Sequence, residues 1–182
     1  KLVLEAADEY ARLKDRFQDR AGQTYLFELD CWHWARYVEN TVLTGQPGDT
    51  VINGRQWDTF MNHPDGIAVS YNMLVYYVSA FLYRTANLVM PMRLHAFLFY
   101  LPLLFIIVFL GILYLVCWRF YGAIAAFVCT MFVGCAPIFL PRSCAGWFDM
   151  DILNQLFALL VVFSYLMSYG RVRPVARFVW LG

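Results

Sequence analysis

The sequence predicts an all-α membrane protein in which several helices cross the bilayer. Hydrophobic residues make up 61% and charged residues only 15% of the 182 residues, which is more apolar than a soluble domain of this size can bury. Three long segments, about residues 97–118, 120–140 and 152–170, contain no Asp, Glu, Lys or Arg. A helix rises about 1.5 Å per residue and the hydrocarbon core is roughly 30 Å thick, so each segment can span it once.

The distribution of charge orients these predicted spans. Arg119 is the only charged residue between the first two spans, and Arg171, Arg173 and Arg177 follow the third. The positive-inside rule therefore places these arginines in the cytoplasm. Residues 1–93 then form a first external loop, and residues 94–182 form the spans, a second external loop at 141–151 and the start of a further span. The net charge of +1, with no concentrated basic surface, argues against nucleic acid as a partner.

Short helices are expected within the first external loop. An amphipathic helix is predicted over residues 2–20. A second is predicted over about 31–44, where Trp34, Val38 and Val42 recur every four residues and Gly45 supplies the stop. Residues 45–66 are rich in turn formers and read as a loop. Residues 67–83 read as a helix lying at the membrane surface, and the alternative is that this segment crosses the membrane.

Carboxylates beside the predicted spans are the main candidates for chemistry. Ionisable side chains at a membrane are costly and are normally retained for a function. Asp30 precedes an aromatic-rich helix, and Asp149 and Asp151 stand one residue apart in the short second loop. Oxygen ligands of this kind suit Mg²⁺ or Mn²⁺. The sequence thus predicts a metal site formed by Asp30, Asp149 and Asp151.

Simpler interpretations of these residues remain open. Asp30 could be an N-cap, although His33 occupies the position at which a capping box needs Glu or Gln. Asp149 and Asp151 could cap the last span and pair with Arg142. A histidine metal site is disfavoured, because the spacing of the three histidines, His33, His63 and His95, fits no compact ligand set. A disulfide between the two external cysteines, Cys31 and Cys144, is possible but not compelled.

Two motifs carry a resemblance to a known family. Residues 142–154 read Arg-Ser-Cys-Ala-Gly-Trp-Phe-Asp-Met-Asp-Ile-Leu-Asn, similar to an Arg-x-x-x-Gly-aromatic-aromatic-Asp-x-Asp signature. Asp30 followed by Trp32 and Trp34 is similar to a first-loop motif of an aspartate followed by aromatics. In this combination the chain resembles the catalytic subunit of oligosaccharyltransferases, the GT-C membrane glycosyltransferases of asparagine-linked glycosylation.

This resemblance implies a fold, a reaction and a location. The expected fold is a GT-C-type multi-span helical bundle. The expected reaction transfers an oligosaccharide from a polyprenyl diphosphate carrier to the asparagine of Asn-x-Ser/Thr in an acceptor polypeptide. Asp30 and Asp149 would ligate Mg²⁺ or Mn²⁺ and hold the acceptor amide, Asp151 would ligate or orient, and Arg142 would balance charge. The active-site face would lie outside the cytoplasm of a multi-pass protein, with a bacterial or archaeal cell membrane favoured over the endoplasmic reticulum.

The sequence leads to one further expectation and leaves two rival interpretations. The chain begins with Lys1 and ends as an apolar run starts, so we interpret it as the N-terminal part of a longer enzyme that would be inactive alone. One rival is another polyprenyl-sugar-dependent GT-C glycosyltransferase, such as an O-mannosyltransferase, although these commonly lack Asp-x-Asp at this place. Another is a transporter or structural membrane subunit, but transporter spans usually carry polar residues at mid-depth and residues 97–118 have none.

Overall fold

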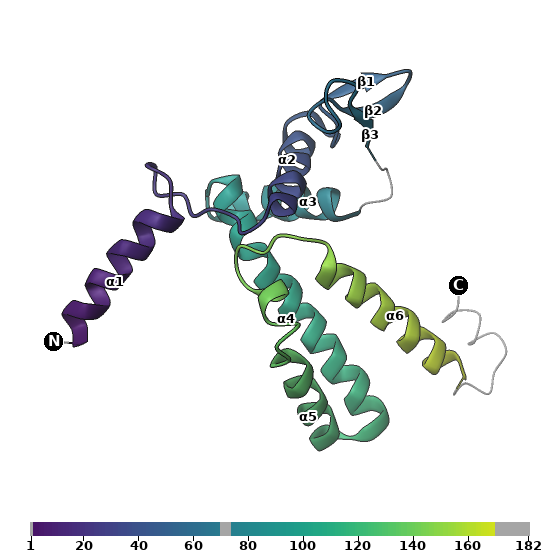
Figure 1. Cartoon of the computed structure of the whole chain (residues 1–182). Coiled ribbons are helices and arrows are strands. Elements are labelled where there is room, and N and C mark those ends of the chain that lie inside the picture. The colour runs from purple at the N-terminus through teal and green to yellow at the C-terminus, as the bar shows by residue number, and fades with distance from the viewer. Residues whose placement is uncertain (1, 70–73, 170–182) are drawn as a thin grey trace. The chain divides into compact units, whose positions relative to one another are not determined.

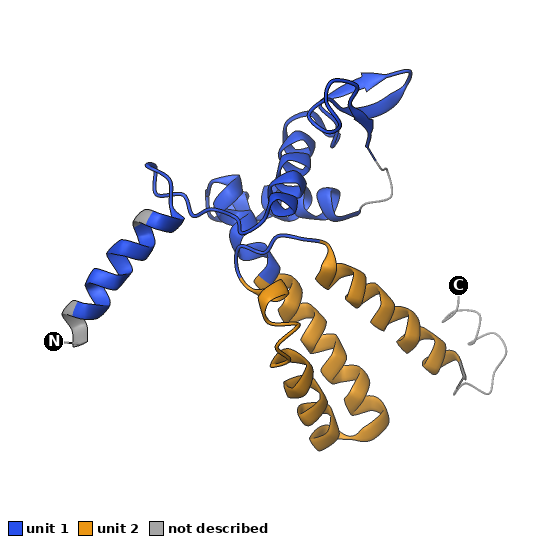
Figure 2. Ribbon diagram, viewed as in Figure 1, with its two compact units in different colours: residues 1–102, 145–149 blue, residues 103–144, 150–182 orange. Residues whose placement is uncertain are grey.

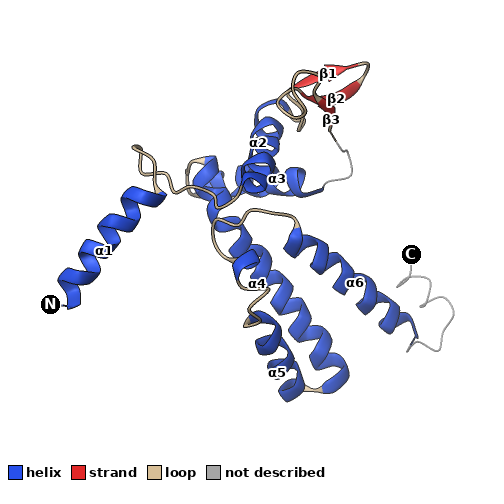
Figure 3. Ribbon diagram, viewed as in Figure 1, coloured by secondary structure: helices blue, strands red, loops and turns tan. Residues whose placement is uncertain are grey.

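The computed structural model of the chain describes residues 2–69 and 74–169 (Figure 1). The described residues form six α-helices, one short 3-10 helix and three strands (Figure 3). The chain divides into two compact units (Figure 2). Unit 1 consists of residues 1–102 and 145–149, and unit 2 consists of residues 103–144 and 150–182. The second loop is therefore shared between the units, because residues 145–149 belong with the N-terminal part of the chain.

Unit 1 is built around a pair of helices. Its helices are α1 (Leu2–Phe17), α2 (Leu29–Thr44), α3 (Leu74–Val89) and the first part of α4. α2 packs on α3, and both bury apolar side chains at this contact, with Val38 and Tyr76 fully enclosed. The rings of Trp34 and Tyr76 stack with centroids 6.0 Å apart. α2 ends where Gly45 adopts a φ of 85°, which a glycine tolerates without steric cost.

A small antiparallel sheet follows α2 in unit 1. Its strands are β1 (Thr50–Ile52), β2 (Arg55–Asp58) and β3 (Ile67–Ala68), in the order β1-β2-β3. Asn53 and Gly54 join the first two strands with φ values of 51° and 78°, as a type I′ hairpin turn requires. The prediction of an all-α chain is therefore corrected here. Strands of two to four residues are too short to show the alternation that identifies a strand in a sequence.

Two described helices are long and apolar enough to cross a membrane. They are α4 (Leu94–Tyr121) and residues 151–168 of α6 (Asp151–Tyr169). Only 28% and 22% of the residues in their most apolar windows are buried, which is unlike the core helix of a soluble domain. Pro102 lies inside α4, where it cannot donate the usual backbone hydrogen bond, and the division between the two units falls directly after it.

Unit 2 contains the rest of α4 and the elements that follow it. These are α5 (Ala123–Gly134), the 3-10 helix η1 (Pro141–Ser143) and α6. Gly122, with a φ of 85°, reverses the chain between α4 and α5. The segment after α5 packs back on α4, because the rings of Phe109 and Phe139 lie 5.5 Å apart. Phe120 and Phe163 make an edge-to-face contact at 6.5 Å between α4 and α6.

The observed elements confirm part of the predicted helix pattern. α2 matches the helix expected over 31–44, and α4 and α6 contain the helices expected in the first and third apolar segments. α5 is only 12 residues long and covers part of 120–140, so a crossing there stays a prediction. The helix expected over 67–83 instead begins at Leu74 after β3, and its placement at the membrane surface stays a prediction. Arg171, Arg173, Arg177 and the further apolar run lie outside the described residues.

Candidate active site

Asp30 lies in the first turn of α2 and is exposed. The residue at the N-cap position is Glu28, whose side chain makes no capping hydrogen bond. The interpretation of Asp30 as the N-cap is therefore wrong, because the helix begins at Leu29, two residues earlier than a cap at Asp30 would place it. Carboxylates in a first turn interact favourably with the positive end of the helix dipole. The Asp30 carboxylate remains open to solvent and thus to a ligand.

The segment of residues 145–149 docks next to the start of α2 within unit 1. Phe27 donates its backbone N–H to the carbonyl oxygen of Gly146 at 3.2 Å, and Gly146 donates to the carbonyl of Phe99 at 2.7 Å. Gly146 has a φ of 89°, and a Cβ built there would lie 2.7 Å from the Phe99 ring. Only glycine permits both the backbone conformation and this close approach. Phe148 is fully buried, which anchors the segment.

The neighbours of the Cys31 thiol show that this segment lies close to the first loop. Burial raises the pKa of Cys31 to about 11, hydrogen-bonding by the backbone of Glu28 and Phe148 opposes this rise, and the Asp149 carboxylate adds to it. Cys31 thus contacts the backbone next to Asp149 and lies in the electrostatic field of that carboxylate. Asp30 immediately precedes Cys31. Cys31 and Asp149 are 118 residues apart in the sequence. The structure therefore brings the two acidic segments that contain them into one compact unit.

Asp151 and Arg142 lie in unit 2 and form an ion pair. Nη1 of Arg142 donates to Oδ2 of Asp151 at 2.6 Å. Arg142 is placed by η1, whose last residue, Ser143, is buried and donates its hydroxyl to the carbonyl of Phe139 at 2.9 Å. α6 begins at Asp151. This pairing at the start of a helix is the simpler interpretation that the sequence left open for Asp151.

The described residues do not assemble a complete metal site. No three His, Cys, Asp or Glu side chains within residues 2–69 and 74–169 are grouped closely enough to hold a metal ion. The chemistry of the donor set still suits a hard divalent cation, since the three aspartates supply only oxygen ligands. Cys31 and Cys144 are free thiols, so the possible bridge between them is not formed. The metal ligands predicted from the sequence stay a prediction.

A buried ionic network that joins α2 to β2 was not predicted from the sequence. Asp58, at the end of β2, is fully buried and accepts hydrogen bonds from both terminal nitrogens of Arg36, from the hydroxyl of Tyr37 at 2.7 Å and from the backbone N–H of Phe60 at 3.0 Å. Burial alone would raise the pKa of Asp58, but the hydrogen bonds from Arg36 and Tyr37 lower it to about 2. Sequence spacing gives no signal for this pairing, because the partners lie on a helix and on a strand within the segment read as a loop.

Two side chains of this region, His33 and Arg36, also line a pocket on α2. Burial and the charge of Arg36 lower the pKa of His33, whose Nδ1 lies 4.0 Å from the Asp58 carboxylate. The guanidinium of Arg36 also lies over the ring of Phe60 at 5.0 Å. His33 and Arg36, together with Trp32 and His95, whose tilted rings have centroids 5.6 Å apart, line a pocket of about 470 Å³ next to the first turn of α2. The fold thus fixes the orientation of α2 at the helix end that carries Asp30.

These features define a mostly helical protein with membrane-length apolar helices, in which acidic segments from two loops meet outside those helices. The chain belongs to the family described as "Oligosaccharyl transferase STT3, N-terminal", which matches residues 2–181. It is 28% identical to "Dolichyl-phosphooligosaccharide-protein glycotransferase" of Methanococcus voltae, over 81% of this chain and 17% of that protein. It is also 28% identical to the protein of the same description from Methanocaldococcus jannaschii, over 91% of this chain and 18% of that protein.

The chain thus spans less than a fifth of the length of these two curated relatives. No solved structure matches it. Family membership is confirmed over nearly the whole chain, and it agrees with the resemblance drawn from the motifs at Asp30 and at residues 142–154.

Proposed function

We propose that this chain is the N-terminal part of an enzyme that transfers an oligosaccharide from a polyprenyl diphosphate carrier to the asparagine of Asn-x-Ser/Thr in a polypeptide. The observation that carries this proposal is the meeting of the Asp149 segment with the start of α2 around Cys31. The names of the two archaeal relatives support a lipid-linked oligosaccharide as donor and a protein as acceptor. On the same basis we place the protein in a GT-C-type multi-span fold with this face outside the cytoplasm.

The chemistry assigned to these carboxylates follows from the weakness of the nucleophile. An amide nitrogen shares its lone pair with the carbonyl group and attacks poorly, so carboxylates that accept hydrogen bonds from the amide N–H groups would orient it and draw density toward nitrogen. Asp30, exposed in the first turn of α2, and Asp149 are the groups we propose for this contact. The attack would form the bond from nitrogen to the sugar carbon and break the bond from that carbon to the carrier diphosphate, and one N–H proton of the amide would pass to one of these carboxylates.

Asp30, Asp149 and Asp151 would hold Mg²⁺ or Mn²⁺ in this scheme. A divalent cation supplies positive charge that stabilises the departing diphosphate. Arg142 would balance the charge of Asp151, to which it already donates a hydrogen bond. Residues 1–182 alone are expected to be inactive, because the chain spans less than a fifth of the length of the two relatives.

The ion pair between Arg142 and Asp151 also bears on the rival functions. A transporter or a structural subunit would use an arginine and an aspartate at a helix end only as a pair. That interpretation explains Arg142 and Asp151, but it gives no reason for Asp149 to be held beside Cys31 in the other unit. Family membership favours transfer to asparagine over O-mannosyl transfer.

The test is glycan transfer by the full-length protein to a peptide that contains Asn-x-Thr. Asp30→Ala and Asp149→Ala should each reduce transfer by about 100-fold or more, as loss of a group that acts on the transition state does. Asp65→Ala removes an exposed loop carboxylate and serves as the control. A chelator should abolish transfer, and added Mg²⁺ or Mn²⁺ should restore it. Unchanged transfer by both variants would contradict the proposed site, and transfer that persists in chelator would contradict the metal.

A further inference from the structure

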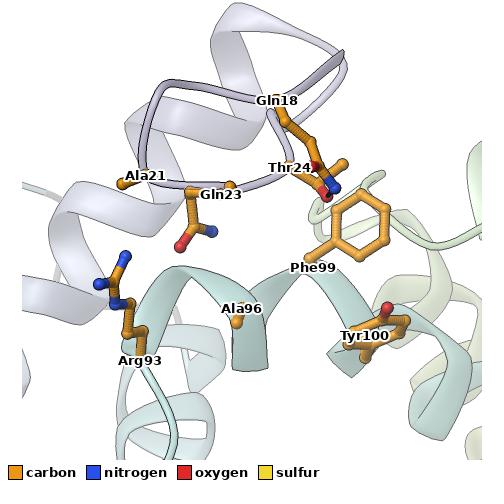
Figure 4. Close-up of a pocket in the computed structure, with 9 residues that line it drawn as sticks. Gln18, Ala21, Gln23, Thr24, Arg93, Ala96, Phe99 and Tyr100 are labelled. Atoms are coloured by element: carbon orange, nitrogen blue, oxygen red, sulfur yellow. Dashed lines mark hydrogen bonds between the residues drawn. The ribbon is translucent and has the colours of Figure 1, made fainter. Parts of the chain in front are cut away.

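A second pocket in unit 1 lies between the segment that follows α1 and the first turns of α4 (Figure 4). It has a volume of about 360 Å³. The side chains that matter for its chemistry are those of Gln18, Gln23, Thr24, Arg93, Phe99 and Tyr100. It shares none of its lining with the pocket beside Asp30.

The loop that forms one wall is held by its own hydrogen bonds. Asp19 donates its backbone N–H to the carbonyl of Gln23 at 2.9 Å, and its Oδ1 accepts the backbone N–H groups of Ala21 and Gln23 at 2.8 Å each. Tyr25 donates to the carbonyl of Phe17 at 2.8 Å and closes the loop. The wall is therefore preformed, and the carboxylate of Asp19 is already bonded to the backbone.

Arg93 supplies a positive charge to this pocket. It forms no ion pair within 4.0 Å with any carboxylate of the described residues. In Figure 4 its guanidinium and the side-chain amide of Gln23 project into the same space above Ala96. A guanidinium and an amide N–H₂ group are both hydrogen-bond donors, and an arginine fork matches the geometry of a phosphate. The pocket thus offers a binding site for a phosphate anion.

Gln18 supplies a hydrogen-bond acceptor to the pocket, in addition to the donors of Arg93 and Gln23. Its Nε2 donates to Oγ1 of Thr24 at 3.1 Å, whereas its Oε1 is buried and has no hydrogen-bond partner in the described structure. A buried acceptor without a partner costs about 1–3 kcal/mol. A ligand with a hydroxyl or ammonium group would remove this cost. The pocket therefore suits a molecule that carries a phosphate and a hydrogen-bond donor close together.

The position of the pocket indicates where such a molecule would come from. Arg93 directly precedes Leu94, the first residue of the membrane-length helix α4. Cations and aromatic residues at the end of a span lie at the level of the lipid headgroups, and Phe99 and Tyr100 supply the aromatic wall. We propose that this pocket binds the phosphate headgroup of a membrane lipid, with the phosphate on Arg93 and Gln23 and a donor group, as in phosphoglycerol or phosphoethanolamine, on Gln18.

The test is native mass spectrometry of the full-length protein, delipidated in detergent and titrated with single lipids. Phosphatidylglycerol and phosphatidylethanolamine should bind more tightly than phosphatidylcholine, whose headgroup has no hydrogen-bond donor. Arg93→Gln should weaken phosphatidylglycerol binding by about tenfold or more, since charge-assisted hydrogen bonds are lost. Gln18→Leu should abolish the preference over phosphatidylcholine while leaving binding of the phosphate largely intact.

Arg119→Gln is the matched control, because Arg119 lies in the last turn of the same helix. If Arg119→Gln weakens binding as much as Arg93→Gln does, the effect is general attraction between cations and lipids, and the proposal is overturned. Equal binding of the three lipids by the wild type would overturn it as well. A polyprenyl phosphate competitor distinguishes the sources: displacement of phosphatidylglycerol that depends on Arg93 identifies the carrier lipid as the ligand, and no displacement identifies the bilayer lipid.

Discussion

Asp58 accepts hydrogen bonds from both terminal nitrogens of Arg36, and this fully buried carboxylate joins the small sheet to helix α2. The pair ties Arg36 of α2, six residues after Asp30, to the end of β2. Because the hydroxyl of Tyr37 and the backbone of Phe60 bind the same carboxylate, all of its acceptor positions are engaged. The geometry of the candidate active site therefore depends on a contact that takes no part in the proposed chemistry.

Loss of the Asp58 charge should destabilise unit 1. Asp58→Asn keeps the shape but leaves the guanidinium of Arg36 without its counter-ion, which should lower the free energy of unfolding by about 3 kcal/mol. This is the lower end of the range for breaking a buried pair, because the Arg36 side chain is 26% exposed. The midpoint of thermal unfolding should fall by several degrees. Asp65→Asn, in the exposed loop, should leave it unchanged, and an equal fall in both variants would contradict the assignment.

The same carboxylate should make stability depend on pH in the acidic range. Its pKa is lowered from 3.8 to about 2, so the folded state favours the ionised form. The stabilisation is fully present above about pH 4 and is lost as the pH falls toward 2, when the carboxyl takes up a proton. The difference in unfolding midpoint between wild type and Asp58→Asn should thus shrink between pH 4 and pH 2. A difference that stays constant over this range would contradict the prediction.

Gly146 should be required for docking of the Asp149 segment. Gly146→Ala meets the Phe99 ring at 2.7 Å and the Phe27 ring at 3.2 Å, in addition to the strain of a φ of 89°. Gly22→Ala is the matched control, because Gly22 has a φ of 77° with open space around it and so incurs only the backbone cost, about 1–2 kcal/mol. Gly146→Ala should be the more destabilising and should also reduce glycan transfer. Equal effects of the two substitutions would show that the contact with Phe99 is unimportant.

Sequence patterns predicted the local structure better than the contacts between segments. α2 could be anticipated from the spacing of Trp34, Val38 and Val42 and from the stop at Gly45, since these signals are local. The hairpin at Asn53 and Gly54 was recognisable only as a turn, because its exposed flanking residues show no apolar alternation. A single sequence gives no means of pairing Arg36 with Asp58.

The candidate site divides in the same way. The joint role of Asp30 and Asp149 is predicted from resemblance to a family, because no periodicity relates residues so far apart. The structure adds the reason why the two segments are close together. The backbone of Gly146 forms hydrogen bonds with Phe27 and Phe99, and these bonds place the residues that follow Gly146 next to Cys31. The pairing of Arg142 with Asp151 could be anticipated, since the two residues lie nine positions apart in one short loop.

The pKa of the Cys31 thiol can be used to test whether the two acidic segments lie close together. With a pKa of about 11, its thiol should react slowly with iodoacetamide at pH 8, because only about one molecule in a thousand carries the thiolate. Asp149→Asn removes a negative charge beside the thiol and should lower its pKa. The pH dependence of alkylation, measured on a variant that keeps Cys31 alone, reports this shift. Asp65→Asn should give no shift, and an unchanged pKa in Asp149→Asn would mean that Asp149 is remote from Cys31.

An exchange of charges can separate the two interpretations of Asp151. If Asp151 only pairs with Arg142, the double variant Arg142→Asp, Asp151→Arg restores the ion pair and should restore both stability and transfer. If Asp151 is a metal ligand, the exchange should recover stability but leave transfer reduced by about 100-fold, because an arginine cannot ligate a cation. The pair is partly exposed, with side chains 57% and 32% accessible, so each single variant should cost less than about 1 kcal/mol of stability. We expect the second outcome. Recovery of transfer by the double variant would assign Asp151 to the ion pair and leave the cation to Asp30 and Asp149.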